Sequence, residues 1–115
     1  MKVIYIAGKY RDSRGEYYVM QNIRAAEEVA MHVWQNGAVA LCPHMNTRLF
    51  GGALPDDAWL EGDMELVRRS DAVYQMKNAH ESMGAKAEIR LARGLGKPVL
   101  EGLDDLLNYI FEGET

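Results

Sequence analysis

The sequence predicts an α/β fold, in which a parallel sheet of about four strands is covered by helices on both faces. Three observations predict it. Short apolar runs alternate along the chain with longer segments whose apolar residues recur at a helical period. The apolar runs lack polar alternation, which is typical of strands buried on both faces. Glycine and proline stand at the ends of several segments, where turns between strands and helices are expected.

The first strand is predicted over residues 2–7, an uninterrupted apolar run that Gly8 ends. A helix is predicted over about residues 16–36, because apolar side chains at a helical spacing share one face there. Gly37 follows that helix in the position of a C-terminal cap. Asn22 lies within the same face, as an amide among valines.

The second strand is predicted over residues 38–42. Residues 43–56 follow without a clear period, and we expect a long loop there, which in compact domains often marks a binding loop. Helical spacing returns over residues 57–69. After that helix, residues 71–76 form the third predicted strand and residues 77–81 a short loop.

Another helix is predicted to begin at Ser82, a residue type that caps helix N-termini, and to end before Gly96. Residues 98–100 are a short fourth strand, and residues 103–111 have the amphipathic period of a final helix. Strands and helices therefore alternate, and strands joined in this way run parallel through right-handed crossovers.

The composition narrows the class of protein. A chain of 115 residues fits one domain, residues 1–115, with its own core. A single cysteine excludes an internal disulfide, and no Cys/His cluster indicates zinc, so we expect a cytoplasmic protein without a cofactor. No apolar run reaches the length of a membrane span, so no membrane partner is expected. The net charge of −4 argues against binding a nucleic-acid polymer, which requires a basic surface.

Two acidic residues stand on the apolar faces of their predicted helices. Glu88 lies among apolar residues in the helix that begins at Ser82, and Asp63 lies among them in the preceding helix. A carboxylate on such a face is costly unless it is paired, hydrogen-bonded or turned into a cleft. Gly84, one turn before Glu88, leaves room over that carboxylate. Two acids in equivalent places therefore suggest a shared cavity.

Parallel sheets of this kind bind ligands beyond the carboxyl ends of their strands. The segments that follow the first three predicted strands all lie at that edge, so Tyr5, Arg11, Asp63, Ser82 and Glu88 could converge there. The start of a helix favours an anion, and a guanidinium binds phosphate well. A substrate that carries a phosphate would therefore suit this edge.

Two carboxylates in a partly apolar cleft suit glycosidic chemistry, in which one attacks or stabilises the anomeric carbon and the other handles the leaving-group proton. Desolvation and like charge should raise the pKa of one of the two. The chain has no glycine-rich nucleotide fingerprint, nucleophile elbow or Walker lysine. Two alternatives stay open: a non-catalytic module that binds or senses a nucleotide in the same cleft, and structural acids beside a protein-interaction surface.

Three sets of residues carry a resemblance to a known family. The chain reads Tyr5-Ile6-Ala7-Gly8 followed by Arg11, then Asp63 before Ser70-Asp71-Ala72-Val73, then Ser82-x-Gly84-x-x-x-Glu88 before Gly96-Lys97-Pro98-Val99. In this order the motifs resemble the nucleoside 2-deoxyribosyltransferase family over nearly the whole chain. Within that family the chain looks most like a compact bacterial and phage branch, with some likeness to deoxynucleoside 5′-monophosphate N-glycosidases.

The resemblance implies a flavodoxin-like fold, usually assembled as homodimers or higher homo-oligomers. It also implies an enzyme that cleaves or transfers at the N-glycosidic bond of a 2′-deoxynucleoside or its 5′-monophosphate. Glu88 matches the family's nucleophile, Asp63 matches the residue that serves the proton on the base, and Tyr5 matches the tyrosine that orients the glutamate. The acceptor, water or a second base, is left open.

The resemblance also implies which residues hold the substrate. Ser82, with Gly8 and Arg11, looks like the branch that acts on 5′-monophosphates, and Gly84 belongs to the same substrate-binding motif. A hydroxyl and a guanidinium accept a phosphate that an aspartate would repel. The pair Lys9-Tyr10 stands where the hydrolases tend to have small residues.

Overall fold

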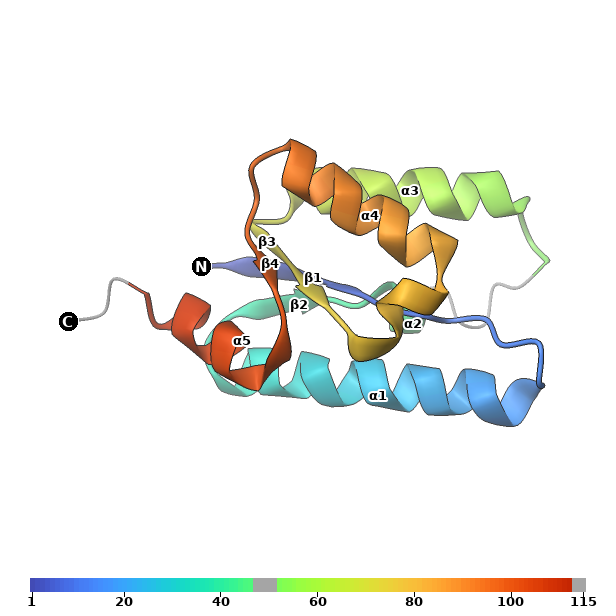
Figure 1. Ribbon diagram of the computed structural model, residues 1–115, viewed down its shortest axis with the longest axis horizontal. Helices are drawn as coiled ribbons and strands as arrows, with labels where there is room; N and C mark the ends of the chain where they lie inside the picture. Colours follow the sequence, from blue (N-terminus) through green and yellow to red (C-terminus); the bar gives the residue numbers. More distant parts are fainter. Residues whose placement is uncertain (47–51, 113–115) are drawn as a thin grey trace.

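The computed structural model describes residues 1–46 and 52–112, which form a four-stranded sheet with helices on both faces (Figure 1). The strands are β1 (Val3–Ala7), β2 (Val39–Leu41), β3 (Ala72–Gln75) and β4 (Val99–Leu100). They pair in the order β2-β1-β3-β4, and every pairing is parallel. The chain order reverses at β1, and such a reversal opens a crevice at the carboxyl ends of the strands.

Four longer helices cover the sheet, and they are α1 (Glu16–Gln35), α3 (Asp56–Arg69), α4 (Met83–Gly94) and α5 (Gly102–Ile110). Figure 1 shows α1 and α5 on one side of the sheet and α3 and α4 on the other. Within the described residues, no helix is both long enough and apolar enough to cross a membrane.

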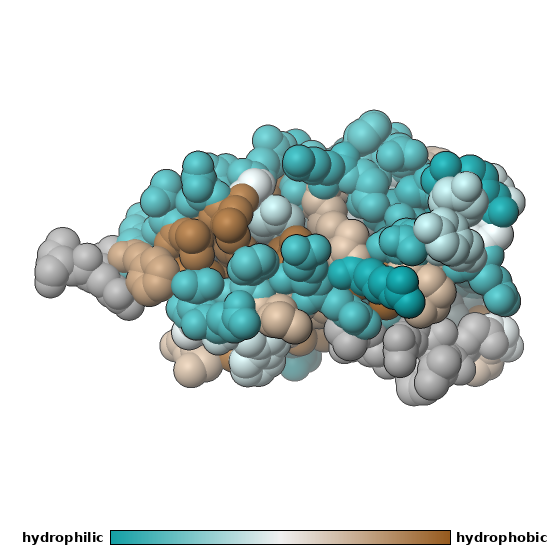
Figure 2. Space-filling view, turned by 90° about the horizontal axis from the view of Figure 1, so that it is seen from below, coloured by the Kyte–Doolittle hydropathy of each residue, from teal (hydrophilic) through white to brown (hydrophobic). Residues whose placement is uncertain are grey.

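One side of the sheet carries a purely apolar core, which we call the α1 face. Ile4 and Ile6 of β1 are buried there in one cluster with Ala26 and Val33 of α1 and Leu106 of α5. Seen from this side, polar residues cover most of the surface, and hydrophobic residues gather at the end near the C-terminus (Figure 2). Aliphatic side chains from three elements therefore close this face against water.

The other side of the sheet, which we call the α4 face, has a more polar core. Tyr5 and Ala7 of β1 are buried there with Val67 of α3 and Ile89 of α4. Successive side chains of a strand point to opposite faces, so Tyr5 lies between two isoleucines in sequence but on the other side of the sheet. This placement turns a phenol towards α3 and α4.

The predicted fold class is confirmed, because the sheet is parallel, four-stranded and covered on both faces, with the strand order of flavodoxin-like folds. The cap of α1 is Asn36 and not Gly37 as predicted, but Gly37 follows it with a φ of +88°, the left-handed conformation in which glycine commonly follows a helix end.

Two predicted loops are wrong in part. The chain forms a short helix, α2 (Pro43–Asn46), at the start of the loop predicted over 43–56, and residues 47–51 of that loop lie outside the described residues. Proline favours the first helical position, because its fixed φ suits the helix and its missing N–H is not needed there. The predicted loop 77–81 is the 3-10 helix η1 (Lys77–Glu81).

Candidate functional site

A cavity of about 500 Å³ lies at the carboxyl-end edge of the sheet. Its walls come from the loop after β1, the start of α2, one face of α3 and the first two turns of α4. Glu88 and Asp63 both line it, as do Gly8, Arg11, Ser82 and Gly84. The structure therefore brings the predicted site residues to one place, with Tyr5 directly beneath Glu88 through a hydrogen bond.

Glu88 is buried on α4, and the Tyr5 hydroxyl donates a hydrogen bond to its Oε2. Burial is the main reason that the pKa of Glu88 is raised to about 7. The hydrogen bond from Tyr5 lowers this pKa, and the negative charge of Asp63 raises it further. A carboxyl group with a pKa near neutrality exchanges its proton readily at physiological pH. The geometry thus provides a fixed, partly desolvated carboxylate.

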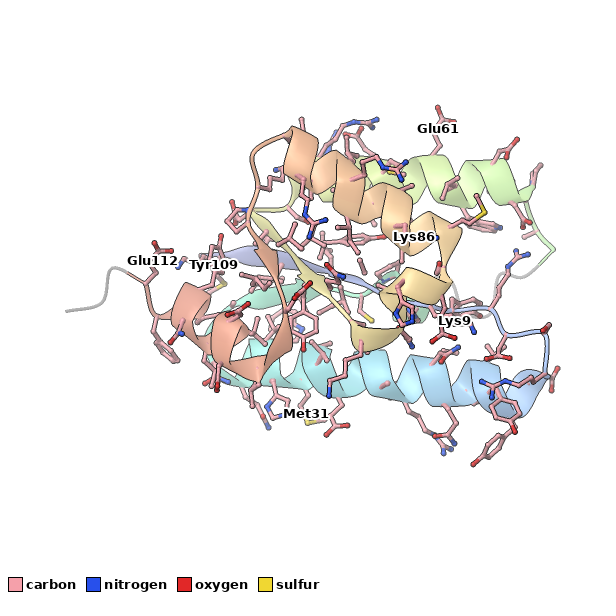
Figure 3. All side chains as sticks on the ribbon, viewed as in Figure 1. Lys9, Met31, Glu61, Lys86, Tyr109 and Glu112 are labelled. Atoms are coloured by element: carbon pink, nitrogen blue, oxygen red, sulfur yellow. The ribbon has the colours of Figure 1, made fainter. Side chains whose placement is uncertain are left out.

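Asp63 is half-buried on α3, and burial raises its pKa to about 6. Its position contrasts with that of Glu61 on the same helix, which points away from the fold (Figure 3). The sequence predicted a raised pKa for one acid of the pair, and the structure raises both. Burial is the main cause of the higher pKa of both groups, and the charge of Asp63 adds a smaller rise at Glu88.

Ser82 caps α4, because its Oγ accepts a hydrogen bond from the backbone N–H of Ala85 at 3.1 Å. Gly84 follows on the cavity wall. A Cβ atom at Gly84 would meet Cδ1 of Leu60 at 3.5 Å, an ordinary contact distance. The space that glycine leaves over Glu88 is therefore bounded by a leucine of α3.

Gly8 ends β1 against Met76, which follows β3. A Cβ atom at Gly8 would lie 3.0 Å from the sulfur of Met76, so glycine permits the close approach of the two strand ends. Arg11 lines the cavity but is held by Asp56, with Nη1 at 3.1 Å from Oδ2 and Nη2 at 2.5 Å from Oδ1. Both side chains of this pair are about 70% exposed, at 72% and 71%.

Sequence reasoning missed the residues that hold the loop after β1. The backbone N–H of Lys9 donates to Oδ1 of Asn78 at 3.0 Å, and its carbonyl accepts from Nε2 of His44 at 2.9 Å. Asn22 donates to the carbonyl of Tyr10 at 3.2 Å. The amide on the apolar face of α1 was the one sign in the sequence that a polar contact lies there.

His44 is buried and lines the cavity. Burial lowers its pKa, so the ring is neutral, and because Nε2 donates to a carbonyl, Nδ1 is left as an acceptor. Nδ1 has no hydrogen-bond partner within the described part of the chain. Among those same residues, no group of three or more His, Cys, Asp or Glu side chains could hold a metal ion.

Comparison with known proteins supplies a family and a fold. A family model described as "Domain of unknown function (DUF4406)" matches residues 2–101. No curated protein matches the chain by sequence.

Solved structures with the same fold include two 2-deoxyribosyltransferases. One, from the psychrotolerant bacterium Bacillus psychrosaccharolyticus, is 16% identical with a TM-score of 0.67 over 86% of this chain and 70% of that one. The other, from Leishmania mexicana, is 21% identical with a TM-score of 0.64 over 88% of this chain and 63% of that one. These structures confirm, at the level of the fold, the resemblance that the motifs predicted.

Proposed function

The chain belongs to the family described as Domain of unknown function (DUF4406), and we propose that it cleaves the N-glycosidic bond of a 2′-deoxynucleoside or a close derivative. One observation carries this proposal. Glu88 is buried beside the Tyr5 hydroxyl and lines a cavity that Asp63 also lines. Two carboxyl groups that line one cavity are the residue types that glycosidic double displacement uses. The shared fold with two 2-deoxyribosyltransferases supports the same chemistry.

In the first proposed step, a carboxylate oxygen of Glu88 attacks C1′ of the sugar. The bond from C1′ to the base nitrogen breaks, and the base takes a proton from Asp63 as it leaves. The product is a glycosyl ester on Glu88. Tyr5 orients the carboxylate for this attack and disperses its charge through the hydrogen bond.

In the second proposed step, an acceptor attacks C1′ and releases Glu88. The acceptor is water in a hydrolase and a second base in a transferase, and in both cases Asp63 takes up the proton that the acceptor loses. Inversion at each step leaves the configuration at C1′ unchanged overall.

The test is to incubate the protein with a panel of 2′-deoxynucleosides and their 5′-monophosphates, with and without a second free base. Chromatography then measures the base that is released. We expect release by the wild-type protein and none by Glu88→Gln. Acid quenching during turnover should trap a sugar adduct on the peptide that contains Glu88. Binding of a panel member without base release at high protein concentration would refute the enzyme and favour the non-catalytic binding module.

A further inference from the structure

We infer that His44 binds the base of the substrate, and that the cavity prefers a base with an amino group, such as adenine or cytosine, to the matching base with an oxo group. This inference rests on the proposed function and names its substrate class. His44 lies in α2, three residues after the end of β2, and lines the cavity. The steps proposed for Glu88 and Asp63 do not use this side chain.

The imidazole ring of His44 has one nitrogen in use. Its Nε2 lies 2.9 Å from the carbonyl oxygen of Lys9, and a carbonyl oxygen only accepts, so Nε2 carries the ring proton. Burial lowers the pKa of His44, so Nδ1 holds no second proton and is an acceptor. Nδ1 has no hydrogen-bond partner among the described residues, although His44 is only 3% exposed. A buried acceptor without a partner costs free energy, and a ligand that supplies a donor removes this cost.

Tyr10 separates Nδ1 from solvent in the structure. The rings of Tyr10 and His44 meet edge to face, with their centres 5.7 Å apart, and Nδ1 itself is enclosed. Tyr10 is half-buried and lines the same cavity. Side chains at a binding site commonly change rotamer when a ligand enters. We therefore expect the Tyr10 ring to turn aside when a base reaches Nδ1.

The arrangement of the elements places His44 at one end of the cavity. In the sheet β1 lies between β2 and β3, and α4 covers β1, β3 and β4. α3 packs beside α4 on the same face (Figure 1), and Leu41 of β2 packs against the cluster that holds Val67 of α3. α3 therefore lies on the β2 side of α4. The direction from Glu88 on α4 to Asp63 on α3 points towards the end of β2, after which His44 follows.

This direction is the one in which the base of the substrate extends. In the proposed first step C1′ lies at Glu88, and the leaving base takes its proton from Asp63. The outer edge of the base then comes to His44. An amino group on that edge donates a hydrogen bond to Nδ1, whereas an oxo group turns its lone pairs towards that of Nδ1 and leaves this nitrogen without a partner.

The experiment measures binding to two matched pairs of nucleosides by calorimetry with Glu88→Gln, which should not turn them over. The pairs are 2′-deoxyadenosine with 2′-deoxyinosine and 2′-deoxycytidine with 2′-deoxyuridine. We expect the amino member to bind about thirtyfold more tightly in every pair that binds. Equal affinities within a pair, tighter binding of the oxo member, or no binding of any nucleoside would overturn the inference.

Substitution of His44 tests whether Nδ1 is responsible. In His44→Gln the amide nitrogen can take the place of Nε2 at the Lys9 carbonyl, but no acceptor stands at the position of Nδ1. Combined with Glu88→Gln, this variant should keep its circular dichroism spectrum and lower the amino preference by about tenfold or more. An unchanged preference would overturn the inference and leave His44 as an anchor of Lys9 only.

His80→Gln is the matched control. Nδ1 of His80 lies 2.8 Å from the carbonyl oxygen of Lys77, but this side chain is exposed and does not line the cavity, so the preference should stay. Nitrogen NMR of labelled histidines needs no substitution of His44. Its Nδ1 signal should move when 2′-deoxyadenosine binds, and an unmoved signal in the bound protein would also overturn the inference.

The outcomes separate this inference from the proposed function. Tighter binding of the amino members without base release supports the role of His44 and refutes the glycosidase. Base release from both members of each pair with equal kcat/KM supports the glycosidase and refutes the role of His44.

Discussion

The two faces of the sheet are built from the same strand and differ in what they bury. On the α1 face, Ile4 and Ile6 pack into an aliphatic core. On the α4 face, Tyr5 stands between them in sequence and meets a buried carboxyl group, Glu88. Burying a carboxyl group costs free energy that apolar packing does not. The α1 face is therefore where stability is gained, and the α4 face is where the candidate site lowers it.

Loss of Glu88 should produce the largest effect on activity. We expect Glu88→Gln to lower kcat for base release by about a thousandfold or more, because an amide cannot attack C1′ as the proposed carboxylate nucleophile does. Circular dichroism should show an unchanged fold. A substitution on the α1 face should not alter kcat of the folded protein, and equal losses of kcat on both faces would contradict the division between them.

Ile6→Ala should be the most destabilising change of the set. Ile6 is fully buried in the α1-face core, and removal of its side chain leaves a cavity that costs about 4 kcal/mol of unfolding free energy. Urea denaturation measures this loss. Ile6→Val, which removes one methyl group, is the matched control and should cost about 1 kcal/mol.

The α4 face should make stability depend on pH. The pKa of Glu88 is raised from 4.5 to about 7, so the folded state holds this proton more tightly than the unfolded chain. The contribution of this proton to the free energy of unfolding is fully present below pH 4.5 and is lost as the pH rises through about 7. The loss amounts to about 3 kcal/mol.

Glu88→Gln removes the contribution of Glu88 and leaves that of Asp63, whose pKa is also raised, to about 6. Its unfolding free energy relative to wild type should therefore rise between pH 4.5 and pH 8, measured by urea denaturation at each pH. An identical pH slope in the two proteins would show that Glu88 keeps an ordinary pKa when folded. Ile6→Val should keep the wild-type slope, because the α1 face carries no such carboxyl group.

Tyr5→Phe should shift the pH profile of activity. The reactive state needs one acid ionised and the other protonated, so kcat/KM should be bell-shaped with its optimum between about pH 6 and 7. The hydrogen bond from Tyr5 lowers the pKa of Glu88, and its removal raises that pKa. The profile should move to higher pH, with about a tenfold loss at pH 6. An unmoved profile with lower activity would assign Tyr5 a packing role only.

Asn78→Ala should have the smallest effect. Asn78 holds the backbone N–H of Lys9, and its loss should loosen the loop after β1, with about a threefold rise in KM and little change in kcat. Asn36→Ala, at the C-terminal cap of α1, is the control, because its side chain also bonds to backbone but lies outside the cavity.

The parts of the fold that periodicity encodes could be predicted from the sequence. A strand buried on both faces or a helix with one apolar face leaves its spacing in the chain, and so does an acid within that face, such as Asp63 or Glu88. Ser82 was predictable as a helix cap, because capping depends on residues close in sequence. In the structure its Oγ accepts a hydrogen bond from the backbone N–H of Ala85, three residues later. The catalytic roles of these residues stay predictions.

Contacts between distant segments could not be predicted. Arg11 and Asp56 are 45 positions apart, and nothing in either neighbourhood indicates that their side chains meet. The same holds for Asn78 and His44, which reach the Lys9 peptide from different elements. Exposed charged side chains and single amides produce no periodic pattern in the sequence, because many different ion-pair or hydrogen-bond partners would serve them equally well.

The central position of β1 has a consequence for how the chain reaches its native state. Lys2, just before β1, donates to the carbonyl of Tyr109 and lies 4.3 Å from the centre of that ring. The start of β1 therefore acquires this contact only when α5 has left the ribosome. Until then the apolar core around Ile4 and Ile6 lacks the side chains that α5 contributes. A nascent chain that stalls before α5 should therefore aggregate more readily and bind chaperones.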